Sequence, residues 1–467
     1  MARAKKEAAL TPEERLQAAL VPDWEWPYKL PKNWCWTRIG NYVDYVTDYV
    51  ANGSFASLKA NVSIFKDENY ALMVKTQDFA NGFTKSLTYT DKHGYDFLSK
   101  STLHGGELIL SNIGSVGKVF RVPYFDRPMT LASNSVMVKC YNSRDYDWMY
   151  YFLLSPIGFE ELKSITTGTA VPKFNKTDLK TIPLPVPPLA EQQRIVDRIE
   201  SLFAKLDEAK EKAQAVVDSF ETRKAAILHK AFTGELTAKW RRTHGLLLDT
   251  WKEVAADSLF EYVTSGSRGW AKYYDESGAV FIRMGNLDHG TIELDFSDIQ
   301  HVKLPNKAEG QRSRIRKNDI LISITADVGM VGLVRNDDFE GYINQHIALA
   351  RPVMSESAEF IAWYLVSDIG LKQMQEKQRG ATKVGLSLND IRALQLKIPL
   401  IEEQNEILKV IKMWIGKEQQ SQEAAEAVLD QIDLMKKSIL ARAFRGELGT
   451  NDPSEESAVE LLKRTIL

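Results

Sequence analysis

Two stretches of this 467-residue chain share one sequence pattern. Residues 187–236 align with residues 399–448 without a gap, at a constant spacing of 212 residues, and 19 of the 50 aligned positions are identical. The spacing persists outside the block, where Gly168 pairs with Gly380. A fixed repeat period indicates that one structural unit occurs twice. We therefore expect two related halves with an internal pseudo-twofold relation.

The similarity between the halves is uneven. The repeated blocks match closely, whereas the stretches before them, residues 22–186 and 250–398, diverge. A plain tandem duplication of a core-forming unit is one explanation. The other is a pair of related modules with different surfaces, which is expected if each module reads a different ligand. Looser correspondences within these stretches match Trp36 with Trp251, and Gly82 with Gly290.

The repeated blocks predict long helices, since no Pro or Gly occurs between Pro188 and Gly234. Apolar or small residues recur at spacings of four and three, as in a coiled coil. About 43 helical residues span about 65 Å, and one such helix cannot bury its own apolar stripe. We expect the two helices to pack together antiparallel; the alternative is that each is buried on its own globular domain. The stripe comprises Ile195, Ile199, Leu202, Leu206, Ala209, Ala213, Val216 and Phe220 in the first block, and Ile407, Ile411, Trp414, Glu418, Ser421, Ala425, Val428, Ile432 and Met435 in the second.

Both blocks end in nearly the same phrase, Ala231 to Leu236 and Ala443 to Leu448. The Gly within each phrase fits the position just after a helix, and the Leu two residues later can pack back on the last turn. The stretches before the blocks mix short apolar runs of β type with helical patterns, so each is predicted to be one α+β domain. Thr11-Pro12-Glu13-Glu14 begins a capping box, and Asp452-Pro453 opens the tail in the same manner. The predicted parts are an N-terminal helix (1–21), a first domain (22–186), a first long helix (187–236), a second domain (250–398), a second long helix (399–448) and a C-terminal tail helix (449–467).

Composition limits the classes of protein that this chain can be. Its hydrophobic content of 44% is typical of globular proteins. Its formal net charge of −2 argues against a protein that binds nucleic acid over its whole surface. Two cysteines fit a reducing compartment and exclude a four-cysteine zinc site. The sequence contains no run of about 18 apolar residues, so no membrane span is predicted. The first residues lack the pattern of a signal peptide. We expect a cytoplasmic protein.

The sequence offers no convincing catalytic site. Gly114 to Val119 contains a Gly-Lys pair but lacks the spacing and hydroxyl residue of a phosphate-binding loop. The seven histidines are scattered, and none has the spacing of a metal ligand. Neither a Gly-x-Ser-x-Gly motif nor the Asn- or Asp-Pro-Pro-aromatic motif of amino-methyltransferases is present. We therefore predict a non-catalytic chain that binds no metal or cofactor itself.

Loops in both halves carry basic, amide and hydroxyl side chains. Arg, Asn and Gln can read base edges, and Lys, Ser and Thr suit phosphates. A solvated rim is the alternative for any single residue, but the recurrence of such loops in both halves favours nucleic acid. The strongest local charge lies at Arg312, Arg314 and Arg316 with Lys317. The candidate DNA-binding residues are Lys59, Lys75, Gln77, Asn112, Lys118, Thr167, Thr169, Lys173, Asn175, Arg268, Arg283, Arg312, Arg314, Arg316, Thr325, Gln345, Arg379 and Lys383.

The run from Pro188 to Val196 (PLAEQQRIV), the long helix and the phrase from Ala231 to Thr237 (AFTGELT) closely resemble the specificity subunit of type I restriction–modification systems. The second copy, from Glu402 to Leu448, matches too, although Leu400-Ile401 replace Pro188-Leu189. The resemblance covers essentially the whole chain. It includes the order of variable domain, long helix, variable domain and long helix.

The resemblance implies that each variable domain is a target recognition domain for one half of a split double-stranded DNA sequence, and that the helices set the spacer between the halves. It also implies docking of two methylation subunits, which bind S-adenosylmethionine, and two restriction subunits, which use ATP and magnesium. A coiled-coil assembly protein with protein-binding heads and a stand-alone DNA methyltransferase or nuclease are the rivals. The helices and their flanks form the expected docking surface and coiled coil, represented by Ile195, Ile199, Leu202, Leu206, Phe220, Phe232, Ile407, Ile411, Trp414, Ile432 and Phe444.

Overall fold

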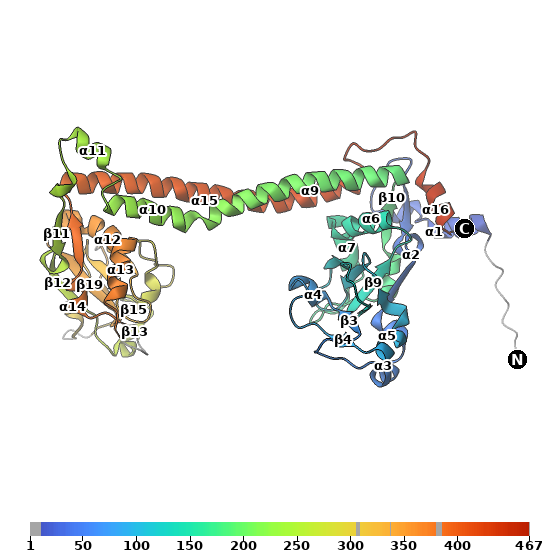
Figure 1. Ribbon diagram of the computed structural model, residues 1–467, viewed down its shortest axis with the longest axis horizontal. Helices are drawn as coiled ribbons and strands as arrows, with labels where there is room; N and C mark the ends of the chain where they lie inside the picture. The colour runs from blue at the N-terminus through green and yellow to red at the C-terminus, as the bar shows by residue number, and fades with distance from the viewer. Residues whose placement is uncertain (1–10, 305–308, 337, 380–384, 467) are drawn as a thin grey trace. The chain divides into compact units, whose positions relative to one another are not determined.

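The computed structural model describes residues 11–304, 309–336, 338–379 and 385–466 (Figure 1). The chain forms two compact units. Unit 1 contains Met1–Glu211 and Leu429–Leu467, and unit 2 contains Lys212–Val428. Among the described residues, no helix is both long and apolar enough to cross a membrane.

Unit 1 is built on two four-stranded sheets and a two-stranded ribbon. One sheet has the order β2-β9-β6-β7 and is antiparallel throughout, and the other has the order β4-β3-β8-β5 with β3 and β8 parallel. The ribbon pairs β1 with β10. The strands are β1 (Cys35–Arg38), β2 (Tyr45–Asp48), β3 (Ala71–Val74), β4 (Tyr89–Thr90), β5 (Thr102–Leu103), β6 (Leu108–Ser111), β7 (Val119–Arg121), β8 (Met129–Leu131), β9 (Ser135–Lys139) and β10 (Pro183–Val186). The shorter helices are α1 (Pro12–Ala19), α2 (Ile39–Tyr42), α3 (Phe55–Asn61), α4 (Thr76–Ala80), α5 (Lys92–Phe97), α6 (Ser143–Leu154), α7 (Pro156–Ser164), α8 (Lys176–Thr181) and α16 (Ala458–Ile466).

Unit 2 repeats this plan. Its sheets have the orders β12-β19-β16-β17 and β13-β15-β14-β18, its ribbon pairs β11 with β20, and its single parallel pair among the described strands is β14 with β18. The strands are β11 (Lys252–Ala255), β12 (Phe260–Ser265), β13 (Tyr274–Asp275), β14 (Ala279–Ile282), β15 (Gln300–Val302), β16 (Ile320–Ser323), β17 (Val331–Leu333), β18 (Gly341–Ile343), β19 (Ile347–Pro352) and β20 (Gln395–Ile398). The shorter helices are α11 (Ala238–Thr243), α12 (Ala358–Val366), α13 (Asp368–Glu376) and α14 (Leu388–Arg392).

A fully buried central strand holds each unit together. In β6, Leu108 and Leu110 pack into one core, whereas Ile109 points to the other face and packs into a second core. In β16, Ile320 and Ile322 likewise pack into one core, and Leu321 packs into another on the opposite face. This alternation follows from the two-residue period of a strand, and burial on both faces explains the unbroken apolar runs in the sequence. The α+β prediction is confirmed for both halves.

The long helices pack antiparallel within unit 1. The first is α9 (Leu189–Asp218), and the second is the continuous α15 (Ile401–Ala443). Lys436 contacts Asp207, and Lys210 lies 3.8 Å from Asp433, so positions rise along one helix as they fall along the other. Ile195, which belongs to the predicted apolar stripe, is fully buried in the core of the unit.

Unit 2 holds a second antiparallel pair, between α10 (Phe220–Phe232) and the first part of α15. Arg223 bonds Glu418 near one end, and Arg241, which follows α10, bonds Glu403 near the start of α15. Each pair ends as the sequence predicts. Gly234 and Gly446 follow the helices with φ of 81° and 73°, a left-handed conformation that favours glycine.

The predicted first long helix is present, and it carries one irregularity that the sequence did not predict. The helix is interrupted at Ser219, between α9 and α10. The hydroxyl of Ser219 donates to the carbonyl of Ala215, four residues earlier, and Arg223 donates to the carbonyl of Val216. Side chains that bond the carbonyls of a preceding turn bend helices, so the break has a local cause without Pro or Gly.

The stripe predicted on the second helix is wrong in part. Trp414 is 42% exposed, whereas the next residue, Ile415, packs against the core of unit 2. Val428 and Met435 are exposed as well. A straight α-helix has 3.6 residues per turn, so a seven-residue pattern drifts by about 20° per heptad and leaves the buried face.

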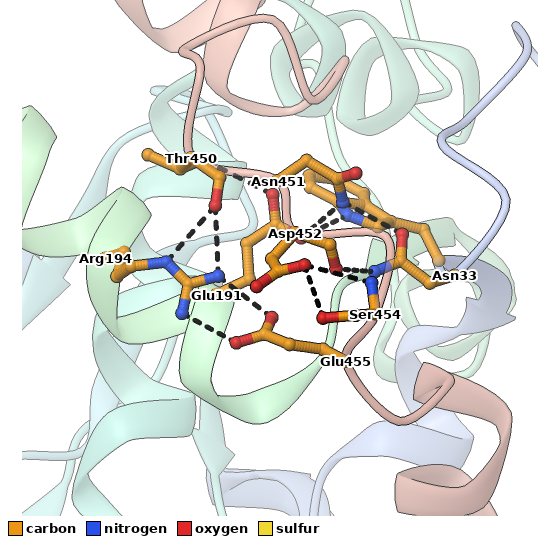
Figure 2. A network of polar contacts seen from close by, with 9 residues as sticks. Asn33, Glu191, Arg194, Thr450, Asn451, Asp452, Ser454 and Glu455 are labelled. Atoms are coloured by element: carbon orange, nitrogen blue, oxygen red, sulfur yellow. Dashed lines mark hydrogen bonds and ion pairs between the residues drawn. The ribbon is translucent and has the colours of Figure 1, made fainter.

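A network of polar contacts ties residues 450–455 to the rest of unit 1 (Figure 2). The buried Glu191 accepts hydrogen bonds from Trp34 Nε1 at 2.7 Å and Asn451 Nδ2 at 2.8 Å, while Arg194 forms ion pairs with Glu455. The tail helix begins at Ala458, not at Pro453 as predicted. The residues between are held instead by these polar contacts. At the other end of the chain, Thr11 forms the predicted capping box of α1.

Candidate nucleic-acid interface

The antiparallel order of the first sheet gathers several loops at one edge of unit 1. Ser111 at the end of β6 is paired with Ser135 at the start of β9, and Asp48 ends β2 at the same edge. The loop of residues 112–118, the turn before β9 and the chain after β2 therefore leave the sheet together. We call this the loop edge of unit 1.

A short closed loop joins this edge. Thr167 and Lys173 form an antiparallel bridge, and Lys173 also bridges to Ile113. The Nδ2 of Asn112 donates to the carbonyl of Phe174 at 3.2 Å. The predicted residues Asn112, Thr167, Thr169 and Lys173 are thus brought together. Asn175 is adjacent, but its side-chain oxygen caps α8 and accepts from the backbone of Thr177 and Asp178.

The second sheet of unit 1 adds residues from the end of β3. There α4 and the 112–118 loop line a hollow of about 600 Å³, whose walls include Gln77, Ser115 and Lys118. Lys75 precedes α4 and is partly engaged, because its Nζ donates to the carbonyl of Ser86 at 2.7 Å. Lys59 lies on α3, exposed to solvent. The predicted residues of the first half therefore come from several loops of one unit.

Unit 2 has an equivalent loop edge. Ser265 ends β12, and Ser323 at the end of β16 is paired with Ile347 at the start of β19. Arg268 and Thr325 follow these strand ends, and Gln345 precedes β19. Thr325 hydrogen-bonds His346, and Gln345 Nε2 lies 2.9 Å from His346 Nε2. Arg379 and Gly385 form the counterpart of the Thr167–Lys173 bridge, and Lys383 lies outside the described residues.

Lys75 and Arg283 are structurally equivalent, although they are not separated by the constant spacing of 212 residues. Each follows the strand that is parallel to its neighbour, β3 in unit 1 and β14 in unit 2. The backbone N–H of Lys75 donates to Asp78, and that of Arg283 donates to Asn286. Arg283 also forms an ion pair with Asp298 at 2.9 Å. Each unit thus has a basic residue beside its loop edge.

The arginine cluster of the second half is divided by the structure. Arg312 reaches the loop edge, where its Nη2 lies 3.3 Å from Ser267 Oγ. Arg316 lies near the opposite end of β16, because its N–H donates to Asp319, just before that strand. Burial raises the pKa of Asp319, although Arg351 forms a bidentate ion pair with it at 2.7 Å. Arg314 lies between the two ends and bridges to Tyr342.

The predicted docking residues differ in exposure. Most form the units' own cores, so their side chains are not offered to a partner. Apolar side chains that are exposed on α15 include Met413 and Trp414 in unit 2, and Leu434 and Met435 in unit 1. The buried members are Ile195, Ile199, Phe232, Ile407, Ile411, Ile432 and Phe444, and the half-buried ones are Leu202, Leu206 and Phe220.

The structure also corrects one correspondence between the halves. The residue equivalent to Trp251 is Trp34, not Trp36. Trp34 Nε1 donates to Glu191, and Trp251 Nε1 donates to Glu403 at 3.0 Å. In the described part of the chain, no group of three or more His, Cys, Asp or Glu side chains is placed to hold a metal ion.

Comparison with known proteins identifies the architecture. The chain matches the family described as the type I restriction modification DNA specificity domain twice, over residues 43–217 and 249–426. The chain belongs to this family. The two matches fall on the two halves, and each covers the two four-stranded sheets of its unit and much of a long helix.

Relatives within the specificity family are distant. The chain is 26% identical to the type I restriction enzyme EcoBI specificity subunit of Escherichia coli over 320 residues, which is 65% of this chain and 66% of the relative, just under two thirds. It is 21% identical to the MjaVIII specificity subunit of Methanocaldococcus jannaschii, over 90% of this chain and 94% of the relative. The crystal structure of an HsdS subunit from Thermoanaerobacter tengcongensis shares the fold, with a TM-score of 0.56, 18% identity, and coverage of 90% of this chain and 99% of that one.

Proposed function

We propose that this chain is the DNA sequence-specificity subunit of a type I restriction–modification enzyme, and that each unit reads one half of a split DNA target. The observation that carries the proposal is the pair of equivalent loop edges. Both are built from the same strand ends, yet they present different side chains. A common scaffold with different reading residues is what recognition of two unlike half-sites requires.

The chemistry of the loop edges suits duplex DNA. Arginine and glutamine side chains, such as Arg268 and Gln345, can bond base edges in the major groove, and lysines such as Lys118 suit phosphates. The loops lie on rigid strand ends, which holds the reading side chains in place. We assign the candidate residues at the two loop edges to DNA contact, and Arg316 to a peripheral position.

The long helices support a role in spacing and assembly. α15 spans about 65 Å at 1.5 Å per residue, compared with about 34–36 Å per turn of DNA. We propose that the helices set the spacer between half-sites and, through exposed residues such as Trp414, contribute to docking two methylation subunits. Two restriction subunits complete the proposed cytoplasmic complex. S-adenosylmethionine, ATP and magnesium are assigned to these partners, and this chain is assigned no catalytic step.

Sequencing of methylated adenines in cells that carry the complex tests the proposal. We expect one motif with two specified halves and a non-specific spacer of fixed length. Deletion of this chain should abolish the methylation, and its return should restore the same motif. A continuous motif without a spacer, or methylation that persists without this chain, would contradict the proposal.

A further inference from the structure

The repeat allows one unit to be compared with the other, and the comparison reveals a difference beside the start of the long helices. In unit 1, the hydroxyl of Tyr42 lies 2.9 Å from Gln192 Oε1 and 3.0 Å from Asp145 Oδ1. All three side chains are buried. Burial and the facing Asp145 raise the pKa of Tyr42 well above its usual value, so the hydroxyl retains its proton. Unit 1 therefore fills this place with its own phenol.

The strand registers identify the equivalent residues of unit 2. The N–H of Ile39 donates to the carbonyl of Ile182, and the N–H of Ala256 donates in the same way to Leu394. Ile39 is thus equivalent to Ala256, and Tyr42, three residues later, is equivalent to Leu259. Cation–π contacts support this register: Lys139 lies over Tyr45, and Arg351 lies over Tyr262. The spacing of 212 makes Ser357 and Gln404 the counterparts of Asp145 and Gln192.

Unit 2 has no phenol at this place. Leu259, Ser357 and Gln404 line a hollow of about 450 Å³. Gln404 is 3% exposed, and its Nε2 donates to the carbonyl of Pro399 at 3.0 Å, as that of Gln192 does to Pro187. Its Oε1 is buried and has no hydrogen-bond partner among the described residues. A buried acceptor without a donor is costly, and native structures seldom retain one.

We propose that this hollow of unit 2 binds a tyrosine side chain presented by a partner protein. The ring would occupy the space that Tyr42 fills in unit 1, and its hydroxyl would donate to Gln404 after a small adjustment of the side chains around that amide. The surrounding surface favours a polypeptide over a free phenol. Val353, Met354 and Leu400 are 59%, 54% and 49% exposed beside the hollow, and they offer apolar area to residues that flank the tyrosine.

The binding experiment uses the full chain and matched small probes. We expect N-acetyltyrosinamide to bind about fivefold tighter than N-acetylphenylalaninamide in saturation-transfer NMR, because only the former has a side-chain hydroxyl that can donate to Gln404. Gln404→Met should abolish this preference. Equal binding of the two amides would overturn the proposal. Binding of p-cresol as tight as that of the tyrosine amide would point to a small phenol and overturn the assignment to a protein.

A second variant tests the proposal without removing Gln404, in case Gln404→Met does not fold. Leu259→Tyr should place an internal phenol in the hollow, as in unit 1, while Leu259→Phe supplies the ring without the hydroxyl. We expect Leu259→Tyr to melt a few degrees above Leu259→Phe and to lose the preference for the tyrosine amide. If Leu259→Tyr keeps that preference undiminished, the probe binds elsewhere and the proposal is wrong.

Discussion

Two glutamates hold equivalent places in the two units, but among the described residues only one of them has an ion-pair partner. Glu403 bonds the guanidinium of Arg241, the hydroxyl of Thr237 and the indole of Trp251. Glu191 accepts from Trp34 and Asn451, both neutral donors. Both carboxylates are buried, and each ties the segment after a long helix to the start of the other. The glutamate that both repeated blocks share is therefore structural, a role that the motif alone did not disclose.

Glu403→Gln is expected to destabilise unit 2 by about 3–5 kcal/mol, because it leaves the buried Arg241 without its counter-charge. Glu191→Gln should cost less, about 1–2 kcal/mol, because the donors to Glu191 carry no charge and the amide oxygen of the new side chain can still accept from them. Hydrogen exchange of α11 and of residues 450–457 measures the two effects separately. Equal protection losses in the two variants would show that the ion pair with Arg241 contributes nothing extra.

The loop edges predict which arginines matter for DNA. Arg268→Ala should weaken DNA binding and, if the side chain contacts phosphate, lower the slope of log affinity against log salt by about 0.9. Arg316→Ala should leave both quantities nearly unchanged, because Arg316 lies toward the opposite end of β16. Gel shifts of the assembled complex across a salt series measure both. A larger loss at Arg316 would place the interface at the other end of the sheet.

At the scale of elements, the sequence pattern predicted that the long helices exist better than it predicted which of their residues are buried. The absence of Pro and Gly located the first long helix, and the repeat, together with the glycines at the ends, located the second. The interruption at Ser219 depends on a side chain bonding a backbone carbonyl, which apolar spacing does not encode. The exposure of Trp414 depends on slow drift between a heptad pattern and the true helical period. The apolar runs of β6 and β16 were found because strands buried on both faces have a strong signal.

Small residues on the helices allow a test of packing. Ala425 is buried in unit 2, whereas its neighbour Ala424 is exposed. Ala425→Leu should therefore destabilise unit 2 by about 1–3 kcal/mol through overpacking, and Ala424→Leu should change stability by less than about 0.5 kcal/mol. Thermal unfolding of the two variants makes the comparison. If both leucines are tolerated equally, the helices do not pack closely at this point.

At the scale of the molecule, the sequence predicted which kinds of residue form the candidate site, and the structure showed where they lie relative to one another within each unit. Residue chemistry singled out Asn112, Lys173 and Thr325, but only strand order showed that such residues share an edge. The same chemistry also selected Arg316, which lies near the opposite end of β16, because charge along a sequence does not reveal which end of a strand it occupies. The correspondence of Trp251 upstream of β2 and β12 was misassigned by two residues, since insertions between the halves change the spacing there.

Exchange of one module tests the division of labour between the units. Replacing residues 22–186 with the matching segment of another family member should change one half of the methylated motif and leave the other half intact. The graft must keep a tryptophan and a tyrosine at the places of Trp34 and Tyr42, because Glu191 and Gln192 on the retained helix bond them. Replacing residues 250–398 should change the opposite half. If either exchange alters both halves, the units do not read DNA independently, and the equivalence of their loop edges has another meaning.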